Sequence, residues 1–207
     1  MYDTVPDLPR CDWAYSGAKS DGALNPLYTH YHDTEWGRPV WDDKLLFSKL
    51  ILDGQQAGLA WITILRKRAT MLTAYDNFDP DVVAHYNDDK IEELLGNKGV
   101  IRSKNKILAT IHNAQKFIEM RETGEGFSDY LWSFVNGKPI QNSWESMEQV
   151  PVKTPISEAL SKDLKKRGFK YVGPVIIYAF MQAVGMVNDH LIGCHCYDEV
   201  KSLGLNL

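Results

Sequence analysis

The sequence predicts an all-α protein, and three features of its pattern support that fold class. Apolar residues recur at intervals of three and four along most of the chain, which is the spacing of one face of an α-helix. No stretch alternates between apolar and polar residues with the period of two that a half-buried strand requires. Neither an internal repeat nor an obvious linker interrupts the pattern. Residues 1–207 are therefore expected to form a single domain, with 1–10 and 198–207 as peripheral tails.

About eight helices account for this pattern. In chain order they are expected at residues 45–51, 60–72, 79 onward, 88–96, 103–124, 127–135, 157–166 and 174–186. Asp79 followed by Pro80 is typical of a helix start, because Asp caps free N–H groups and Pro has no N–H to satisfy. Asp88 is expected to cap the helix that stops at Gly96. Segment 139–155 is polar, contains three prolines and is expected to be a loop.

The composition excludes several classes of protein. Hydrophobic residues make up 44% and charged residues 24% of the 207, as in an ordinary globular protein, so disorder and low complexity are excluded. The longest apolar stretch, 172–184, is interrupted by Gly173, Pro174 and Gln182 and is shorter than the ~20 residues that span a bilayer. The N-terminus has no basic region followed by an apolar one, so no signal peptide is expected and the cytoplasm is the expected compartment.

The charges are unevenly distributed along the chain, although the net charge is only −4. Segment 161–174 holds five basic residues against one acidic residue, and segment 98–106 holds four basic residues and no acid. Residues 66–68 add a third basic cluster. A mildly acidic protein with separate basic segments is able to present a basic face to nucleic acid. Alternatively, each cluster is simply a solvated helix end.

One basic segment has the pattern of a helix-hairpin-helix, a motif that grips the DNA backbone. A helix ends at Gly168, and Gly173 followed by Pro174 begins the next one. Phe169 and Val172 are spaced to fill the angle between the two helices. The first turn of the second helix offers free N–H groups to a phosphate. The residues expected to contact DNA are Lys166, Arg167, Gly168, Lys170 and Gly173. The alternative is a tight turn between helices with solvated lysines.

Cysteine and histidine residues at the two ends of the chain form a candidate metal site. His190 and Cys194 are four residues apart and face the same way on a helical turn, whereas Cys11 and His32 lie near the N-terminus. Two Cys and two His make a closed tetrahedral set that suits structural zinc. Competing candidates are Cys196, His195 and His30, and the simpler alternative is buried thiols and surface histidines. Three cysteines do not predict a disulfide framework.

The N-terminal third of the chain is rich in aromatic residues that surround one carboxylate in the sequence. The aromatic residues are Trp13, Tyr15, Tyr28, Tyr31, Trp36, Trp41 and Trp61. Asp53 lies among glycines in the segment 52–61. Aromatic faces with one carboxylate suit a planar, cationic ring, through stacking and cation–π attraction. The alternative is that the aromatic residues are core and Asp53 caps a helix.

Five blocks of the sequence resemble the bacterial DNA-3-methyladenine glycosylase I family, within the helix-hairpin-helix glycosylases. The blocks are residues 31–37, 54–61, 131–135, 165–173 and 188–190 together with Cys194, and the resemblance runs from Cys11 to Tyr197. It implies an all-helical fold in which one structural zinc ties the N- and C-terminal segments. The implied zinc ligands are Cys11, His32, His190 and Cys194. The interval between the first two ligands is longer than is usual for the family, with the excess in 16–23.

The resemblance also implies an activity, which is hydrolysis of the N-glycosidic bond of 3-methyladenine in alkylated double-stranded DNA. The implied enzyme is monofunctional and monomeric, acts on a flipped base, and has no membrane partner. A methylated adenine that is already cationic leaves easily and needs little general-acid help. The implied base pocket consists of Asp53, Tyr28, Tyr31, Trp36, Trp61 and Trp13. Gly58 and Leu59 correspond to the segment that enters the gap left by the flipped nucleotide.

Two positions depart from what the resemblance and its superfamily lead us to expect. Asp53 stands where the family is expected to have Glu, so its carboxylate is withdrawn by one methylene. Asn188 stands where many other helix-hairpin-helix glycosylases have a catalytic Asp, and Asp189 follows it. The first departure raises an alternative function, a catalytically weak protein of the same fold that binds damaged or abasic DNA. A zinc-containing helical scaffold without a DNA role is a third possibility.

Overall fold

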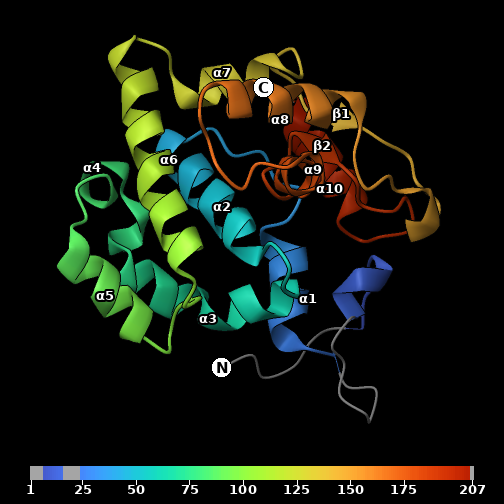
Figure 1. Ribbon diagram of the computed structural model, residues 1–207. Coiled ribbons are helices and arrows are strands. Elements are labelled where there is room, and N and C mark those ends of the chain that lie inside the picture. The colour runs from blue at the N-terminus through green and yellow to red at the C-terminus, as the bar shows by residue number, and fades with distance from the viewer. Residues whose placement is uncertain (1–6, 16–23, 206–207) are drawn as a thin grey trace.

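The computed structural model describes residues 7–15 and 24–205, and these residues are almost entirely helical (Figure 1). The α-helices of this part of the chain are α1 (Pro26–Thr34), α2 (Asp43–Gln56), α3 (Trp61–Ala74), α4 (Pro80–Val83), α5 (Asp88–Gly96), α6 (Lys104–Glu122), α7 (Phe127–Ser133), α8 (Pro155–Lys166), α9 (Pro174–Ala183) and α10 (Tyr197–Leu205). The shorter elements are the 3-10 helices η1 (Asp12–Tyr15), η2 (Asp76–Phe78) and η3 (Met147–Gln149) and the strands β1 (Ile140–Gln141) and β2 (Val187–Asn188). The predicted helical fold class is confirmed.

Most helix boundaries follow local signals in the sequence. Asp79 caps α4, as its place before a proline predicts. At the start of α8, Thr154 and Ser157 each accept a hydrogen bond from the other's backbone N–H, which forms a capping box. The cap of α5 is Asn87 and not Asp88, so that prediction is wrong by one residue. Asn and Asp both cap well, and the sequence alone does not decide between neighbours.

Helices α1 and α10 and the pair of strands are missing from the sequence-based prediction. Helix α1 carries tyrosines and histidines in place of an aliphatic stripe, so its period is weak. Strand β1 pairs in parallel with β2, with Ile140 opposite Val187, and orders part of the segment expected to be a loop. Two-residue strands are too short to reveal a period of two. Helix α9 ends at Ala183, three residues earlier than expected.

Most described residues of the two expected peripheral tails are exposed, but Arg10 and Val200 within them are packed against the rest of the protein. Helix α10 occupies the C-terminal segment, and its Val200 is only 2% exposed. Arg10 is buried, and its guanidinium forms an ion pair with Asp33 at 2.8 Å. The His195 N–H donates to the Pro9 carbonyl at 2.9 Å, so the two ends lie against each other. The remaining residues of these tails, and the longer interval at 16–23, lie outside the described residues.

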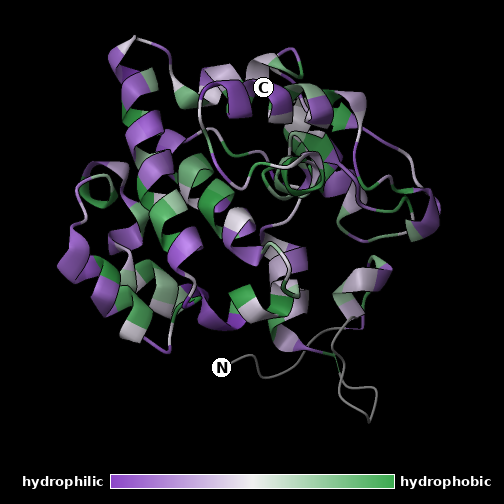
Figure 2. Cartoon of the chain, in the orientation of Figure 1, coloured by the Kyte–Doolittle hydropathy of each residue, from purple (hydrophilic) through white to green (hydrophobic). Residues whose placement is uncertain are grey.

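Two groups of buried side chains make up the core of the part of the chain that the structure describes. The larger surrounds α2, where Phe47 contacts Phe117 of α6 at a ring-centroid distance of 5.1 Å. The smaller joins α1, α3 and the C-terminal segment and includes Cys11, Tyr31 and Trp36. Figure 2 shows hydrophobic residues on the central helix α2 and hydrophilic residues on the outer side of α5. No helix in residues 7–15 and 24–205 combines the length and apolar character needed to cross a bilayer.

Candidate functional site

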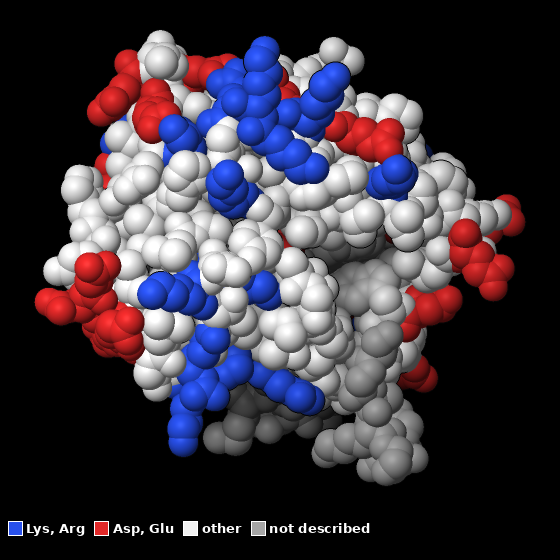
Figure 3. Space-filling view, in the orientation of Figure 1, with Lys and Arg blue, Asp and Glu red and all other residues white. Residues whose placement is uncertain are grey.

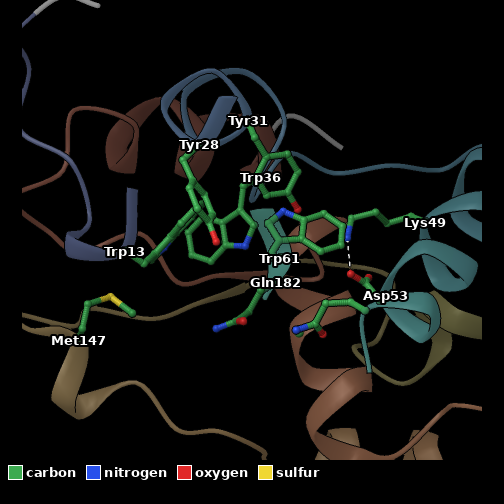
Figure 4. Close-up of a pocket in the computed structure, with 11 residues that line it drawn as sticks. Trp13, Tyr28, Tyr31, Trp36, Lys49, Asp53, Trp61, Met147 and Gln182 are labelled. Carbon is green, nitrogen blue, oxygen red and sulfur yellow. Dashed lines mark hydrogen bonds and ion pairs between the residues drawn. The ribbon is translucent and has the colours of Figure 1, made fainter. Parts of the chain in front are cut away.

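A pocket of about 310 Å³ lies where the smaller buried group meets α2 and α9 (Figure 4). Its lining residues are Trp13, Tyr28, Tyr31, Trp36, Lys49, Asp53, Gln56, Trp61, Met147, Ala179 and Gln182. All six residues expected to form a base pocket therefore line one cavity, although they come from four separate elements and, for Trp36, the turn after α1.

The aromatic walls of the pocket pack against one another at an angle. Trp13 contacts Tyr28 and Trp36 at ring-centroid distances of 6.0 and 5.0 Å, with interplanar angles of 69° in both pairs. Tyr31 packs against Trp61 at 5.4 Å. The Tyr28 hydroxyl accepts a hydrogen bond from the Ile62 N–H at 3.2 Å, which ties α1 to the start of α3. Rings fixed in this way form a cavity of the kind that suits a flat, apolar-faced ligand.

Asp53 supplies the carboxylate of the pocket from the last turn of α2. Its side chain is 7% exposed, and its Oδ1 atom accepts a hydrogen bond from Lys49 Nζ at 2.5 Å. Oδ2 is buried and has no hydrogen-bond partner among the described residues. Burial raises the pKa of Asp53, and the ammonium group of Lys49 opposes that shift. Asp42, eleven residues before Asp53, is the N-cap of α2, so the alternative that Asp53 caps a helix is wrong.

Lys49 is a pocket residue that sequence reasoning missed. Its Nζ atom lies 4.3 Å from the centroid of the Trp61 ring and 5.9 Å from that of Tyr31. Burial lowers the pKa of Lys49, and the charge of Asp53 opposes that shift. The only sequence signal is the spacing of four residues from Asp53, which is also typical of an ordinary surface ion pair. Gln56, Met147, Ala179 and Gln182 were missed too, and Met147 comes from the segment expected to be a loop.

Cys11, His32, His190 and Cys194 form a compact, fully buried cluster. Their ligand atoms all lie within 4.8 Å of one another. Cys194 Sγ is 3.5 Å from His32 Nε2 and 3.5 Å from His190 Nδ1, and Cys11 Sγ is 3.6 Å from His190 Nδ1. Zinc bonds of ~2.3 Å to sulfur and ~2.0–2.1 Å to nitrogen at tetrahedral angles separate these atoms by about 3.6 Å. The donor set and spacing therefore fit a tetrahedral metal ion.

Hydrogen bonds behind the two histidines fix which nitrogen faces the cluster. His32 Nδ1 lies 2.7 Å from Asp33 Oδ1, and His190 Nε2 lies 3.1 Å from the Trp36 carbonyl oxygen. With each of these nitrogens donating, the opposite nitrogen of each ring is left to bind a metal. Gly37 permits the approach of His190, because a Cβ at position 37 would come within 2.9 Å of the ring.

The competing metal ligands lie near the cluster but in a different arrangement. His195 and Cys196 form a second group with His32 and Asp33. Arg10 already donates to both carboxylate oxygens of Asp33, so a cation there would meet a positive charge. Asp33 instead holds the His32 ring in place, as acids behind metal-bound histidines do. His30 belongs to neither group and is exposed.

The α8–α9 hairpin has the local geometry that its sequence predicts. Gly168 adopts a φ of +96°, and Phe169 and Val172 are each 2% exposed between the two helices. Asn113 of α6 holds the loop: its Oδ1 accepts from the Lys170 N–H at 2.7 Å, and its Nδ2 donates to the Lys170 carbonyl at 3.0 Å. Gly173 is the N-cap of α9 and offers no side chain to the first N–H groups, which leaves them available to an anion.

The charged side chains of the hairpin divide into two sets. Lys166 and Lys170 are exposed. Arg167 is engaged within the protein, by ion pairs with Asp163 at 2.7 Å and Glu125 at 2.5 Å. In Figure 3, Lys and Arg side chains gather at the top of the view, where α8 lies in Figure 1, and again at the lower left, with largely uncharged surface between.

The turn between α2 and α3 lies beside the pocket. Gly58 has a φ of +75°, and Leu59 is 37% exposed, as a residue that meets DNA would need to be. Gln56 lines the pocket and donates a hydrogen bond to the Leu59 carbonyl at 2.6 Å. The hairpin is close as well, because a Cβ on Gly54 would lie 3.2 Å from Tyr171. The pocket, this turn and the hairpin thus meet around the end of α2.

Asp189 is buried and accepts hydrogen bonds from four side chains. The donors are Tyr178, Gln182, Asn142 and Trp144, at 2.6, 2.8, 2.6 and 2.8 Å. Neither Asn188 nor Asp189 lines the pocket. A carboxylate with four donors serves to hold α9 to the segment after β1, and it has little remaining capacity to activate water.

Comparison with known proteins decides the family. The family model described as methyladenine glycosylase matches residues 21–197. The chain belongs to the methyladenine glycosylase family. It is 46% identical to DNA-3-methyladenine glycosylase 1 of Escherichia coli (strain K12) over 194 residues, which cover 94% of this chain and 100% of that protein.

Solved structures of methyladenine glycosylases share the fold. A crystal structure of 3-methyladenine DNA glycosylase I matches with a TM-score of 0.86 at 47% identity, covering 91% of this chain and 100% of that one. The Staphylococcus aureus enzyme, solved to explain its recognition of 3-methyladenine, matches with a TM-score of 0.83 at 35% identity, covering 89% and 97%. The pocket, hairpin and metal cluster lie within the residues that the methyladenine glycosylase model matches, except Cys11 and Trp13, which precede them.

Proposed function

We propose that this protein is a monofunctional DNA glycosylase that hydrolyses the N-glycosidic bond of 3-methyladenine in alkylated double-stranded DNA. The observation that carries the proposal is the aromatic pocket around the buried carboxylate of Asp53, which adjoins the hairpin. Membership of the methyladenine glycosylase family supports it. We further propose that the protein acts in the cytoplasm as a monomer.

Cleavage of the glycosidic bond needs little catalytic assistance from the protein once the base is flipped into the pocket. Adenine methylated at N3 is cationic while attached to the sugar, so cleavage of the C1′–N9 bond sends its electron pair into the ring and cancels the charge. Water adds to C1′ and releases a proton to solvent. Trp61 and the other rings stack on the base, and Asp53 accepts a hydrogen bond from its exocyclic amino group. No strong general base is needed, which agrees with the engagement of Asp189 by four donors.

We propose that Cys11, His32, His190 and Cys194 hold one zinc ion. The burial of all four residues and the spacing of their ligand atoms support this assignment. With four protein ligands the ion has no open position, so it supplies a cross-link and no catalytic step. The cross-link would hold α1 against the segment before α10. Helix α1 carries two of the pocket tyrosines.

We propose that the hairpin binds the phosphate backbone and that Gly58 and Leu59 enter the gap left by the flipped base. Lys166 and Lys170 are exposed, and the first turn of α9 offers free N–H groups at Gly173. Gly168 gives the turn its left-handed bend. Arg167 has a structural part in DNA binding: its charge is paired with Glu125, and this ion pair holds the hairpin in place.

Replacing Lys170 with Ala is expected to weaken DNA binding several-fold, and by the same factor for methylated and undamaged duplexes, because backbone contacts carry no base information. The slope of log affinity against log salt should fall by about one. Binding measured over a salt series checks this. Lys153→Ala is the matched control, since Lys153 is exposed at the opposite end of α8 and pairs with Glu158. A loss confined to methylated DNA would contradict this role for the hairpin.

Release of free 3-methyladenine from an alkylated duplex, identified by chromatography, tests the proposed activity. The alternative of a catalytically weak protein predicts binding to damaged or abasic DNA without release, and the shorter side chain of Asp53 is the observation that motivates it. A helical scaffold with no DNA role predicts neither release nor a salt-dependent affinity.

A further inference from the structure

We propose that Lys49 is a specificity-determining residue of the pocket, whose ammonium group occupies the place of a cationic base and must leave Asp53 before such a base binds. The proposal rests on the proposed function, because it concerns the same pocket and the same class of ligand. In this proposal Lys49 disfavours binding of a cationic base, whereas Asp53 and the aromatic rings favour it.

The contacts of Lys49 are those that a bound cation would make. Its Nζ atom donates to Asp53 Oδ1 at 2.5 Å and lies 4.3 Å from the centroid of the Trp61 ring (Figure 4). Attraction of a positive charge to a carboxylate and to an aromatic face is what selects a cationic base. In the free protein the ammonium group of Lys49 therefore already occupies one oxygen of Asp53 and the Trp61 ring, which leaves only Oδ2 of Asp53 without a partner among these contacts.

A cationic base that entered the pocket would meet a like charge at short range. A ring that reached both Asp53 and Trp61 would lie within a few ångströms of Nζ, because the ammonium group is in contact with both residues. Two like charges at that distance in a site shielded from water repel strongly. A neutral base avoids this repulsion and gains a hydrogen-bond donor. The ammonium group thus lowers the preference of the pocket for the cation.

The structure provides a second location for the Lys49 side chain. A cavity of about 460 Å³ lies on the other side of Lys49 and Tyr31 and is also lined by Glu35 and Arg68. Glu35 accepts from Arg68 there at 2.6 and 2.7 Å, so an acidic group is within this second cavity. Lys49 lines both cavities and has a long, flexible side chain. Movement into this cavity would place the ammonium group beside the Glu35–Arg68 ion pair and leave both oxygens of Asp53 available to a base.

Binding of two isolated bases tests the role of Lys49 separately from catalysis. The probes are 3,9-dimethyladeninium, a permanent cation, and 3-methyladenine at a pH where it is uncharged, followed by quenching of tryptophan fluorescence. We expect Lys49→Met to tighten binding of the cation on the order of 10-fold and to change binding of the neutral base by less than about 3-fold. Lys44→Met is the matched control, because Lys44 lies on the same helix and pairs with Asp79 on the surface.

A second pair of variants keeps the test valid if Lys49→Met is unstable. In Lys49→Met/Asp53→Asn both buried charges are gone, and such a replacement is commonly tolerated. This double variant should bind the cation at least about 10-fold more tightly than Asp53→Asn alone, in which the ammonium group has lost its partner. An unchanged ratio of cation to neutral affinity in both comparisons would overturn the proposal, as would a failure of either base to bind. Binding without release of base from DNA would contradict only the proposed activity.

Discussion

Replacing Asp53 with Asn is expected to slow release of 3-methyladenine from DNA by about 10- to 100-fold, because a charged hydrogen bond in a buried site contributes roughly 1.5–3 kcal/mol. The variant should retain its affinity for abasic DNA, since the hairpin that binds the backbone is unchanged. Its melting temperature should fall, because the buried ammonium group of Lys49 loses its partner. Single-turnover release and thermal unfolding of the same preparation measure both effects.

Two further variants separate the chemical role of Asp53 from its structural one. Asp53→Glu restores the longer side chain expected for the family and should release base at an equal or faster rate. Lys49→Met/Asp53→Asn should recover much of the lost stability without recovering the rate, because no carboxylate is present to accept from the base. Normal release by Asp53→Asn would show that the carboxylate does not face the flipped base.

Removal of the metal is expected to destabilise the protein by several kcal/mol, which lowers the melting temperature on the order of 10 °C. The four ligands are buried and join α1 to the segment before α10, so their separation opens the smaller buried group. The pocket is affected because Trp36 packs on the His190 ring at a centroid distance of 4.7 Å. Thermal unfolding with and without a strong chelator measures the loss.

Variants of the cysteines identify the site that holds the metal. Cys11→Ala should lose the ion and reproduce the low melting temperature. Cys196→Ala is the matched control, since Cys196 is equally buried but lies outside the four-residue cluster. Elemental analysis that finds no zinc in the purified protein, or an unchanged content in Cys11→Ala, would contradict the assignment.

The sequence predicts most of the fold because helices and caps are local. Gly168 and Gly173 followed by proline mark the hairpin, and the buried state of Phe169 follows from its place between two helices. Helix α1 and the β1–β2 pair escape prediction because tertiary packing, and not a periodic stripe, holds them. The aromatic composition around Asp53 indicates a pocket, but the choice of its six residues depends on the family resemblance, since nothing local links Trp13 to Trp61.

The role of a residue could not be predicted from the sequence where its partners are distant along the chain. Arg167 looks like a DNA contact in its basic segment, yet Glu125 lies 42 residues away and pairs with it. Lys49 has the spacing of a surface ion pair with Asp53, and only the packing of Trp61 over it reveals a buried charge. The same limit applies to the metal cluster. His195 and Cys196 are of the same residue types as the four clustered residues, and only their positions in the fold separate them.

A single-turnover assay on an alkylated duplex shows whether this chain removes 3-methyladenine from DNA and leaves the strand intact. We expect free 3-methyladenine to appear with time and the DNA to break at the abasic sites only after treatment with alkali. Loss of release in Asp53→Asn would link the activity to the pocket. Binding of the duplex by the metal-loaded wild-type protein with no 3-methyladenine released would contradict the proposed activity.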